Sequence, residues 1–129
     1  MEQTFGSFVR QRRQALGISL RGLAARAELS PVYMSSIETD RKAAPAKEIL
    51  ERLAVELRLG KEERETFLDL AAKSRKQRVS ADLPVYIMEK DIVRAALRTA
   101  KEVDATDEEW QEFIDRITKR CRAATEESE

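Results

Sequence analysis

The chain of 129 residues contains no histidine and only one cysteine, Cys121. Histidine is the commonest general base and metal ligand, and a lone thiol forms no disulfide within its own chain. The usual zinc ligand sets and the Ser-His and Cys-His nucleophile pairs are therefore missing. The carboxylates of "KEER" and "TDEEWQEF" fall on densely charged helical segments without a glycine-rich loop, as is typical of solvated helix faces. We expect a protein without catalytic activity, cofactor or metal.

Long hydrophobic runs are also missing. No segment approaches the roughly 18 apolar residues of a membrane span, and "MEQTFGSFVRQRR" lacks the apolar core of a signal peptide. We therefore expect a cytoplasmic protein with no membrane contact. Lys and Arg number 24, as do Asp and Glu, so the net charge is zero. Residues 1–60 hold 10 Lys/Arg against 7 Asp/Glu, whereas residues 83–129 hold 8 Lys/Arg against 12 Asp/Glu. The N-terminal part of the chain is therefore mildly basic and the C-terminal part is acidic.

Helical periodicity recurs along the chain, whereas strand alternation does not. Apolar residues spaced three and four apart predict helices over residues 5–16, 20–26, 31–38, 45–57 and 61–73. Ser19 and the pair Ser30-Pro31 are typical of helix starts, and Gly17 tolerates the left-handed conformation of a helix end. The expected fold class is all-α, with a five-helix domain over residues 1–73.

The last third of the chain predicts a second, smaller helical unit over residues 83–122. It follows a polar linker, "SRKQRVSAD" at 74–82, and precedes a tail at 123–129 that we expect to be disordered. A capping box of Thr106 and Glu109 starts its last helix. Its apolar faces could fold back on the first domain, but the polar linker favours pairing with a second chain. The predicted dimerisation residues are Ile92, Val93, Ala96, Leu97, Trp110, Phe113, Ile114 and Ile117.

The stretch "LAARAELS" joins two short helical patterns through a very short turn, and "MSSIE" is followed by the basic "DRK" and then by Pro45. A steep joint of this kind lets one helix brace across the DNA backbone while the other enters the major groove. The pattern resembles the helix-turn-helix of the lambda-repressor-like, Xre family of bacterial transcriptional regulators over about residues 5–72. The resemblance implies a five-helix DNA-binding domain whose third helix reads the operator.

The candidate DNA contacts lie at the starts of the second and third helices and in the loop that follows. They are Ser19, Arg21, Ser30, Pro31, Val32, Tyr33, Ser35, Ser36, Arg41 and Lys42. Val32 and Ser36 match positions that touch base edges in similar repressors, whereas Arg41 and Lys42 fall where the loop meets phosphates. An ordinary solvated surface is the alternative interpretation. Because this face has no Arg, Asn or Gln, specificity would depend on Val32 against thymine methyls, hydroxyl contacts and DNA shape.

Other positions are also interpreted through this resemblance. Glu28 and Asp40 stand where family members usually have glycine, so both are expected at or near positive φ. Leu20 replaces a glutamine that often binds phosphate. Arg13 and Glu38 fall on positions that form a partly buried ion pair between the first helix and the end of the third.

We therefore expect a sequence-specific, double-stranded DNA-binding transcriptional regulator, acting as a repressor and as a homodimer on a near-palindromic operator. The alternative is an antitoxin or adaptor whose main role is to bind a partner protein. Some similar short repressors are controlled by a metallopeptidase, so a regulatory metallopeptidase or a toxin is a further candidate partner. Activation of transcription is not excluded by the sequence.

Overall fold

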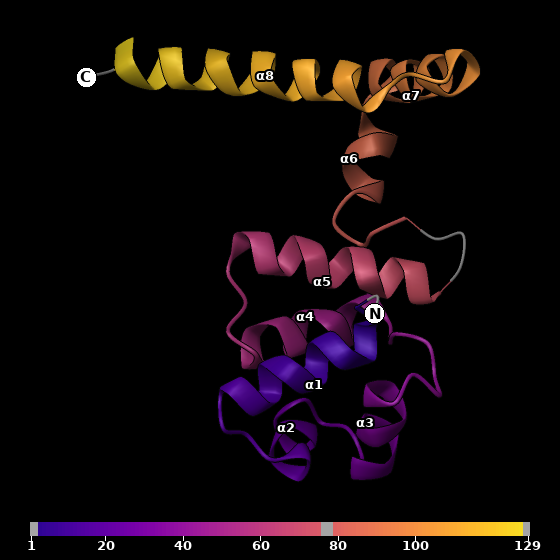
Figure 1. Ribbon diagram of the computed structural model, residues 1–129, viewed down its shortest axis with the longest axis vertical. Helices are drawn as coiled ribbons and strands as arrows, with labels where there is room; N and C mark the ends of the chain where they lie inside the picture. Colours follow the sequence, from indigo (N-terminus) through magenta and orange to yellow (C-terminus); the bar gives the residue numbers. More distant parts are fainter. Residues whose placement is uncertain (1–2, 76–78, 128–129) are drawn as a thin grey trace. The chain divides into compact units, whose positions relative to one another are not determined.

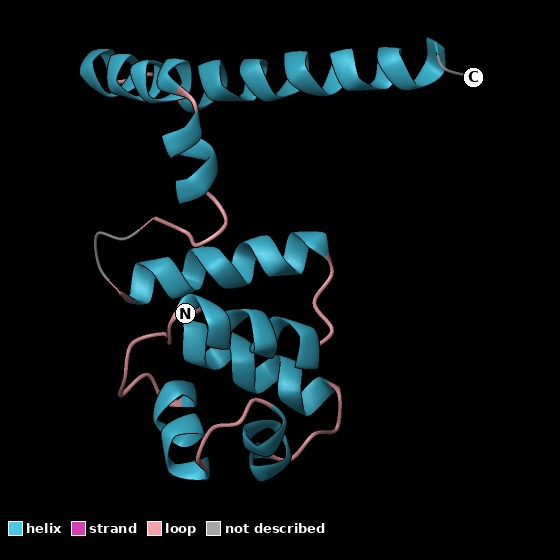
Figure 2. Cartoon of the chain, turned by 180° about the vertical axis from the view of Figure 1, so that it is seen from behind, coloured by secondary structure: helices cyan, strands magenta, loops and turns pink. Residues whose placement is uncertain are grey.

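The computed structural model describes residues 3–75 and 79–127, with the side chains of 123–127 outside the description. In this part of the chain all regular structure is helical, and no strand is present (Figure 2). The helices form two compact units, Met1–Tyr86 and Ile87–Glu129. The expected all-α fold class is therefore confirmed.

The first unit contains five helices that correspond to the five predicted ones (Figure 1). They are α1 (Phe5–Ala15), α2 (Leu20–Arg26), α3 (Pro31–Glu38), α4 (Lys47–Glu56) and α5 (Lys61–Ser74). Helix α3 packs against α1 and α2, while α5 packs against α1 and α4. Helix α1 thus packs against both α3 and α5.

Side-chain caps at the expected residues fix where the short helices begin. The Ser19 Oγ accepts a hydrogen bond of 2.9 Å from the amide of Gly22, and the Ser30 Oγ accepts one of 3.1 Å from the amide of Tyr33. Pro31 follows as the first residue of α3, where the missing N–H leaves no hydrogen bond unmade. Gly17, just after α1, has φ +69° as its position predicted.

The start of α4 differs from the prediction. Pro45 was expected in the first turn, but α4 begins at Lys47 with Ala46 as its N-cap in extended conformation. Ala44 and Pro45 are buried, and the Ala44 amide donates a 2.9 Å hydrogen bond to the Ser74 Oγ. This tertiary anchorage to α5 keeps the two residues outside the helix.

A single apolar core fills the first unit, and Phe67 of α5 lies within it with no exposed surface. Its ring centroid lies 5.1 Å from that of Phe5 and 5.9 Å from that of Phe8. Leu23 of α2 and Met34 of α3 are also fully buried in this core. Burial of each such side chain contributes about 1.5–3 kcal/mol to folding, so the core fixes the two short helices against the longer ones.

The second unit contains α7 (Asp91–Val103) and α8 (Asp107–Glu127), and the boundary between the units falls within α6 (Pro84–Glu89). Asp104 takes a left-handed conformation between α7 and α8. The predicted capping box is present, because the Thr106 Oγ1 accepts from the Glu109 amide while the Glu109 Oε1 accepts from the Thr106 amide. None of the residues of α7 is buried within the chain.

The predicted linker and tail differ from the structure. In the segment interpreted as a linker, Ser74 belongs to α5, Ser80 is buried and hydrogen-bonds Asp69, and Ala81 packs against the core. Residues 76–78 lie outside the described residues. The helical backbone of α8 continues to Glu127, through most of the segment expected to be disordered, because Ala and Glu are strong helix formers that extend an existing helix.

Candidate nucleic-acid interface

The joint between α2 and α3 occupies residues 27–30. Glu28 has φ +60°, the left-handed conformation that the resemblance implied for this position. Its carboxylate lies 2.9 Å from the Arg52 guanidinium, which also donates a 3.1 Å hydrogen bond to the carbonyl of Ala27. The Leu29 amide donates to the carbonyl of Ala24 at 2.8 Å. Contacts from α4 therefore support a turn that has no glycine to relieve its strain.

Helix α3 has one buried face and one exposed face. Met34 and Ile37 are completely buried, whereas Val32 leaves 78% of its surface exposed. The Ser36 hydroxyl, one turn after Val32, donates to the Val32 carbonyl at 3.0 Å, so its oxygen keeps a free lone pair. The exposed face is therefore apolar at Val32 and can accept a hydrogen bond at Ser36.

The structure brings most of the predicted DNA contacts to the surface of α2, α3 and the following loop. The exposed ones are Ser19, Arg21, Ser30, Pro31, Val32, Ser35, Arg41 and Lys42. Ser36 and Tyr33 are half-buried, and the Tyr33 ring packs against the hydrophobic core. Leu20 likewise packs against the core, so its side chain has a structural role.

The loop after α3 presents two neighbouring cations. The amides of Arg41 and Lys42 both donate to the carbonyl of Ser36, at 3.0 and 3.2 Å. Within the described residues neither side chain has an ion-pair partner. The loop is thus anchored through its backbone while its positive charges remain available to an anion.

A partly buried ion pair connects α1 to the end of α3, as the resemblance implied. The Arg13 guanidinium donates to both carboxylate oxygens of Glu38, at 2.8 and 3.0 Å, and to the carbonyl of Ile18 at 2.9 Å. The hydrogen bond to Glu38 raises the pKa of Arg13 above its usual value, against the opposing effect of desolvation. Both groups point away from solvent, so the pair holds α3 in place rather than contacting a ligand.

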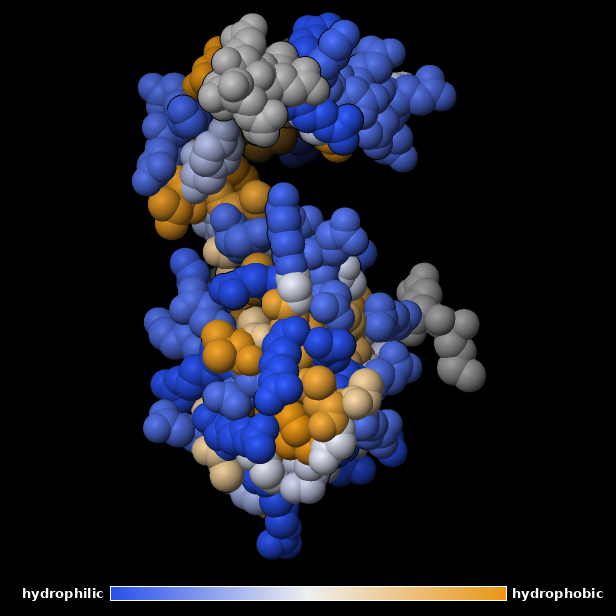
Figure 3. Space-filling model, turned by 90° about the vertical axis from the view of Figure 1, so that its left-hand side faces the viewer, coloured by the Kyte–Doolittle hydropathy of each residue, from blue (hydrophilic) through white to orange (hydrophobic). Residues whose placement is uncertain are grey.

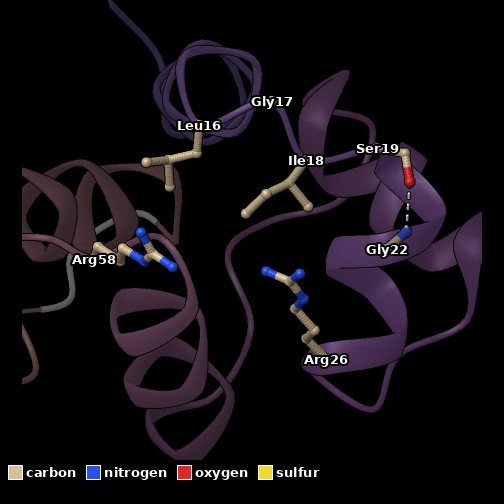
Figure 4. Close-up of a pocket in the computed structure, with 7 residues that line it drawn as sticks. All are labelled: Leu16, Gly17, Ile18, Ser19, Gly22, Arg26 and Arg58. Atoms are coloured by element: carbon tan, nitrogen blue, oxygen red, sulfur yellow. Dashed lines mark hydrogen bonds between the residues drawn. The ribbon is translucent and has the colours of Figure 1, made fainter.

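A hollow of about 280 Å³ lies beside the start of α2. Figure 4 shows the Arg26 and Arg58 guanidinium groups pointing into it, from the end of α2 and from the segment just after α4. In the described part of the chain neither arginine has an ion-pair partner. Sequence reasoning missed both residues. Helical spacing from Ser19 and Gly22 could have found Arg26, whereas Arg58 is distant in sequence and required the fold.

The predicted dimerisation residues lie on α7 and α8, largely exposed to solvent. The exposed fractions are 75% for Ile92, 54% for Phe113 and 52% for Ile114. Trp110 is half-buried and meets Phe113 edge-on at a centroid distance of 6.0 Å. In the upper part of Figure 3, hydrophobic residues in orange reach the surface among charged residues in blue. The second unit therefore leaves apolar surface uncovered in the single chain.

In the described residues, no group of three or more His, Cys, Asp or Glu side chains is arranged to hold a metal ion. No helix in that part of the chain has the length and hydrophobicity of a membrane span.

The five-helix arrangement, with a short bracing helix, a tight turn and a second helix exposed on one face, defines a helix-turn-helix domain. Residues 4–67 match the model of the family described as "helix-turn-helix domain". The helix-turn-helix part of the resemblance is thereby confirmed.

No curated protein sequence matches the chain significantly. Among solved structures, one chain of a SinR protein/SinI protein complex is similar, with 23% sequence identity and a TM-score of 0.47. The similarity covers 92% of this chain and 99% of that one.

Proposed function

We propose that the protein is a cytoplasmic transcriptional regulator that binds double-stranded DNA, represses transcription and has no catalytic role. The observation that carries the proposal is the exposed face of α3, which a buried core supports and which Arg41 and Lys42 flank. Among the described residues these two cations have no ion-pair partner. A rigid helix with an exposed face and a basic loop at its end can enter the major groove while the loop contacts phosphates.

The chemistry of this face favours readout by shape and apolar contact. Val32 can pack against a thymine methyl group, and the Ser36 oxygen can accept a hydrogen bond from a base amino group. Tyr33 is half-buried against the core, so we assign its hydroxyl to phosphate rather than to a base. Affinity then comes mainly from the phosphates, through Arg41, Lys42, Arg21 and the start of α2 at Ser19.

We further propose that the protein acts as a homodimer through the apolar faces of α7 and α8. Within a dimer, burial of exposed side chains such as Ile92 and Phe113 would stabilise the second unit. Two-fold symmetry would set two α3 helices about 34 Å apart, one turn of DNA, on a near-palindromic operator. Tethering makes the second half-site contact effectively intramolecular, which offsets the small number of contacts that each domain offers.

The same apolar faces favour one alternative, in which the protein is an adaptor or antitoxin and α7 and α8 bind a different protein. A toxin or a regulatory metallopeptidase would be such a partner. If the full chain is monomeric alone and purifies with the product of a neighbouring gene, this alternative gains support over the homodimer.

The proposal is tested by measuring fluorescence anisotropy of DNA from upstream of the protein's own gene over a range of salt concentrations. We expect affinity to fall steeply with salt and to exceed the affinity for DNA of scrambled sequence. Equal binding to both would contradict operator recognition, and no binding at low salt would contradict a DNA-binding role altogether.

The basic loop gives a sharper test of the interface. Replacing both Arg41 and Lys42 with Ala should weaken binding to every DNA sequence alike and make the salt slope shallower by roughly 0.9 per lost contact. Lys61 and Lys73 of α5 provide a control pair, because replacing them removes the same charge from exposed positions outside the proposed interface. A salt slope that the Arg41 and Lys42 changes leave unaltered would place the loop outside the interface.

A further inference from the structure

Asp40, which precedes Arg41 and Lys42 of the basic loop, connects the end of α3 to the start of α1. The Asp40 Oδ2 accepts a hydrogen bond of 2.6 Å from the Thr4 hydroxyl, and the Asp40 Oδ1 accepts one of 3.0 Å from the Gly6 amide. Thr4 is the N-cap of α1, and its Oγ1 also accepts from the amide of Ser7. Both carboxylate oxygens of Asp40 are therefore used at the start of α1.

Close packing at Gly6 brings the two segments together. A Cβ on Gly6 would lie 2.5 Å from the Ile37 carbonyl oxygen, 2.6 Å from that of Glu38 and 2.7 Å from the Asp40 Oδ1. The start of α1 thus lies directly against the last carbonyls of α3. The contact is also electrostatically favourable, because the positive end of the α1 dipole, at its N-terminus, meets the negative end of the α3 dipole, at its C-terminus.

The Asp40 carboxylate adds to the same electrostatic arrangement. Helix α1 has no acidic side chain in its own first turn, so Asp40 supplies a negative charge there from another part of the chain. Asp40 itself has φ +59°, a conformation that strains most residues and that Asp tolerates better than most. Glycine would take this conformation without strain but would make neither hydrogen bond.

The position of Asp40 connects this contact to the DNA-facing loop. Arg41 and Lys42 follow it immediately, and their amides bond to the Ser36 carbonyl of α3. Because the Asp40 carboxylate is engaged at α1, it does not pair with either cation. The loop is thus held at Asp40 by α1 and at its amides by α3, and neither cation forms an ion pair within the part of the chain that the structure describes.

We propose that Asp40 is a positioning residue, whose carboxylate fixes the basic loop against the start of α1 so that Arg41 and Lys42 meet the DNA backbone in one geometry. This inference rests on the proposed DNA-binding function and assigns a specific role in it to the Asp40–Thr4–Gly6 contact.

Two substitutions separate positioning from charge. Asp40→Asn and Asp40→Gly remove the same negative charge, and both tolerate the left-handed backbone. Asn can still accept from the Gly6 amide and donate to the Thr4 hydroxyl, whereas Gly makes neither contact. We expect Asp40→Gly to bind operator DNA about tenfold more weakly than Asp40→Asn, because two hydrogen bonds to a side chain are lost. Its salt slope should also be shallower, since Arg41 and Lys42 would contact phosphates less often.

Hydrogen exchange at the Gly6 amide reports the contact without DNA. We expect faster exchange in Asp40→Gly than in Asp40→Asn, and both measurements belong at a temperature where circular dichroism shows each variant fully folded. If Gly6 exchanges faster in Asp40→Gly while affinity and salt slope equal those of Asp40→Asn, the contact is only structural and the positioning role is wrong. If Gly6 exchange is the same in the two variants, the contact itself is refuted.

Failure of the proposed function has a different signature. If the unsubstituted protein shows no salt-dependent DNA binding, the DNA-binding function fails and the positioning role fails with it. If the unsubstituted protein binds and only the difference between the Asn and Gly variants is missing, the DNA-binding function stands and the inference about Asp40 alone is overturned.

Discussion

The two units of the chain differ in how they bury apolar side chains. In the first unit, α1 to α5 enclose residues such as Phe67, Leu53 and Met34 completely. In the second unit, α7 has no buried residue, and side chains such as Ile92 and Phe113 remain exposed. Since apolar burial is the main force that stabilises a fold, the first unit can be stable by itself. The second is expected to gain much of its stability from a partner chain.

The largest expected effect contrasts a core phenylalanine with an exposed one. Phe67→Ala should lower the free energy of unfolding of the first unit by about 3–5 kcal/mol, because it leaves a cavity among Phe5, Phe8 and their neighbours. Phe113→Ala, which removes the same atoms from an exposed position, should leave that unfolding transition unchanged. Denaturant unfolding followed by circular dichroism measures both. Equal destabilisation would show that the two units share one cooperative core.

A second contrast concerns ion pairs. Glu38→Gln should destabilise the first unit by about 3 kcal/mol, because it leaves the Arg13 guanidinium without its charged partner in a site with little exposure. Asp91→Asn breaks the Arg94–Asp91 pair, whose carboxylate is almost fully exposed, and should change stability little. Thermal unfolding of both variants at equal salt provides the comparison. A small effect at Glu38 would mean that core packing alone holds α3 against α1.

Self-association should depend on the second unit. We expect the full chain to be dimeric at micromolar concentration, and Ile114→Asp to make it monomeric and reduce operator affinity about a hundredfold through lost avidity. Val55→Asp is the matched control, since Val55 is an exposed valine of α4 in the first unit. A chain ending at Tyr86 should be folded and monomeric. Light scattering measures the masses, and a full chain that is monomeric alone would refute the homodimer.

The smallest expected effect belongs to base recognition. Val32→Ala and Ser36→Ala should each shift preference among operator variants by less than about tenfold, because neither residue makes a bidentate contact with a base. Non-specific binding and the mass in solution should stay the same in both variants. The control Val55→Ala should leave operator preference, non-specific binding and mass unchanged. Binding to a panel of single-base operator variants tests this. Uniform loss on every variant would show that these residues do not read bases.

Much of the first unit could be predicted because its signals are local. Three- and four-residue spacing located the helices, and Ser19, Ser30 and Pro31 marked two of their starts. Pro45 shows the limit of such signals. Its residue type favours a first helical turn, but burial of Ala44 and Pro45 and the bond to Ser74 keep it outside α4.

The candidate site shows the same limit. Val32, Arg41 and Lys42 could be proposed from sequence because helix periodicity and the position of the loop place them outside the core. Arg58 could not, because only the packing of α4 brings it to the hollow beside Ser19. The two hydrogen bonds of Asp40 also span more than thirty residues, and no local pattern predicts such a contact.

The sequence by itself determined most of the helices, the caps at Ser19 and Ser30 and the exposed face of α3, because these depend on near neighbours along the chain. The left-handed positions at Glu28 and Asp40 came from the resemblance to the family. Tertiary structure alone decided how α3 is held, through the bonds of Asp40 to Thr4 and Gly6, and how Glu28 is supported by Arg52. These contacts join segments far apart in sequence, and they form only when burial of the common core brings the helices together.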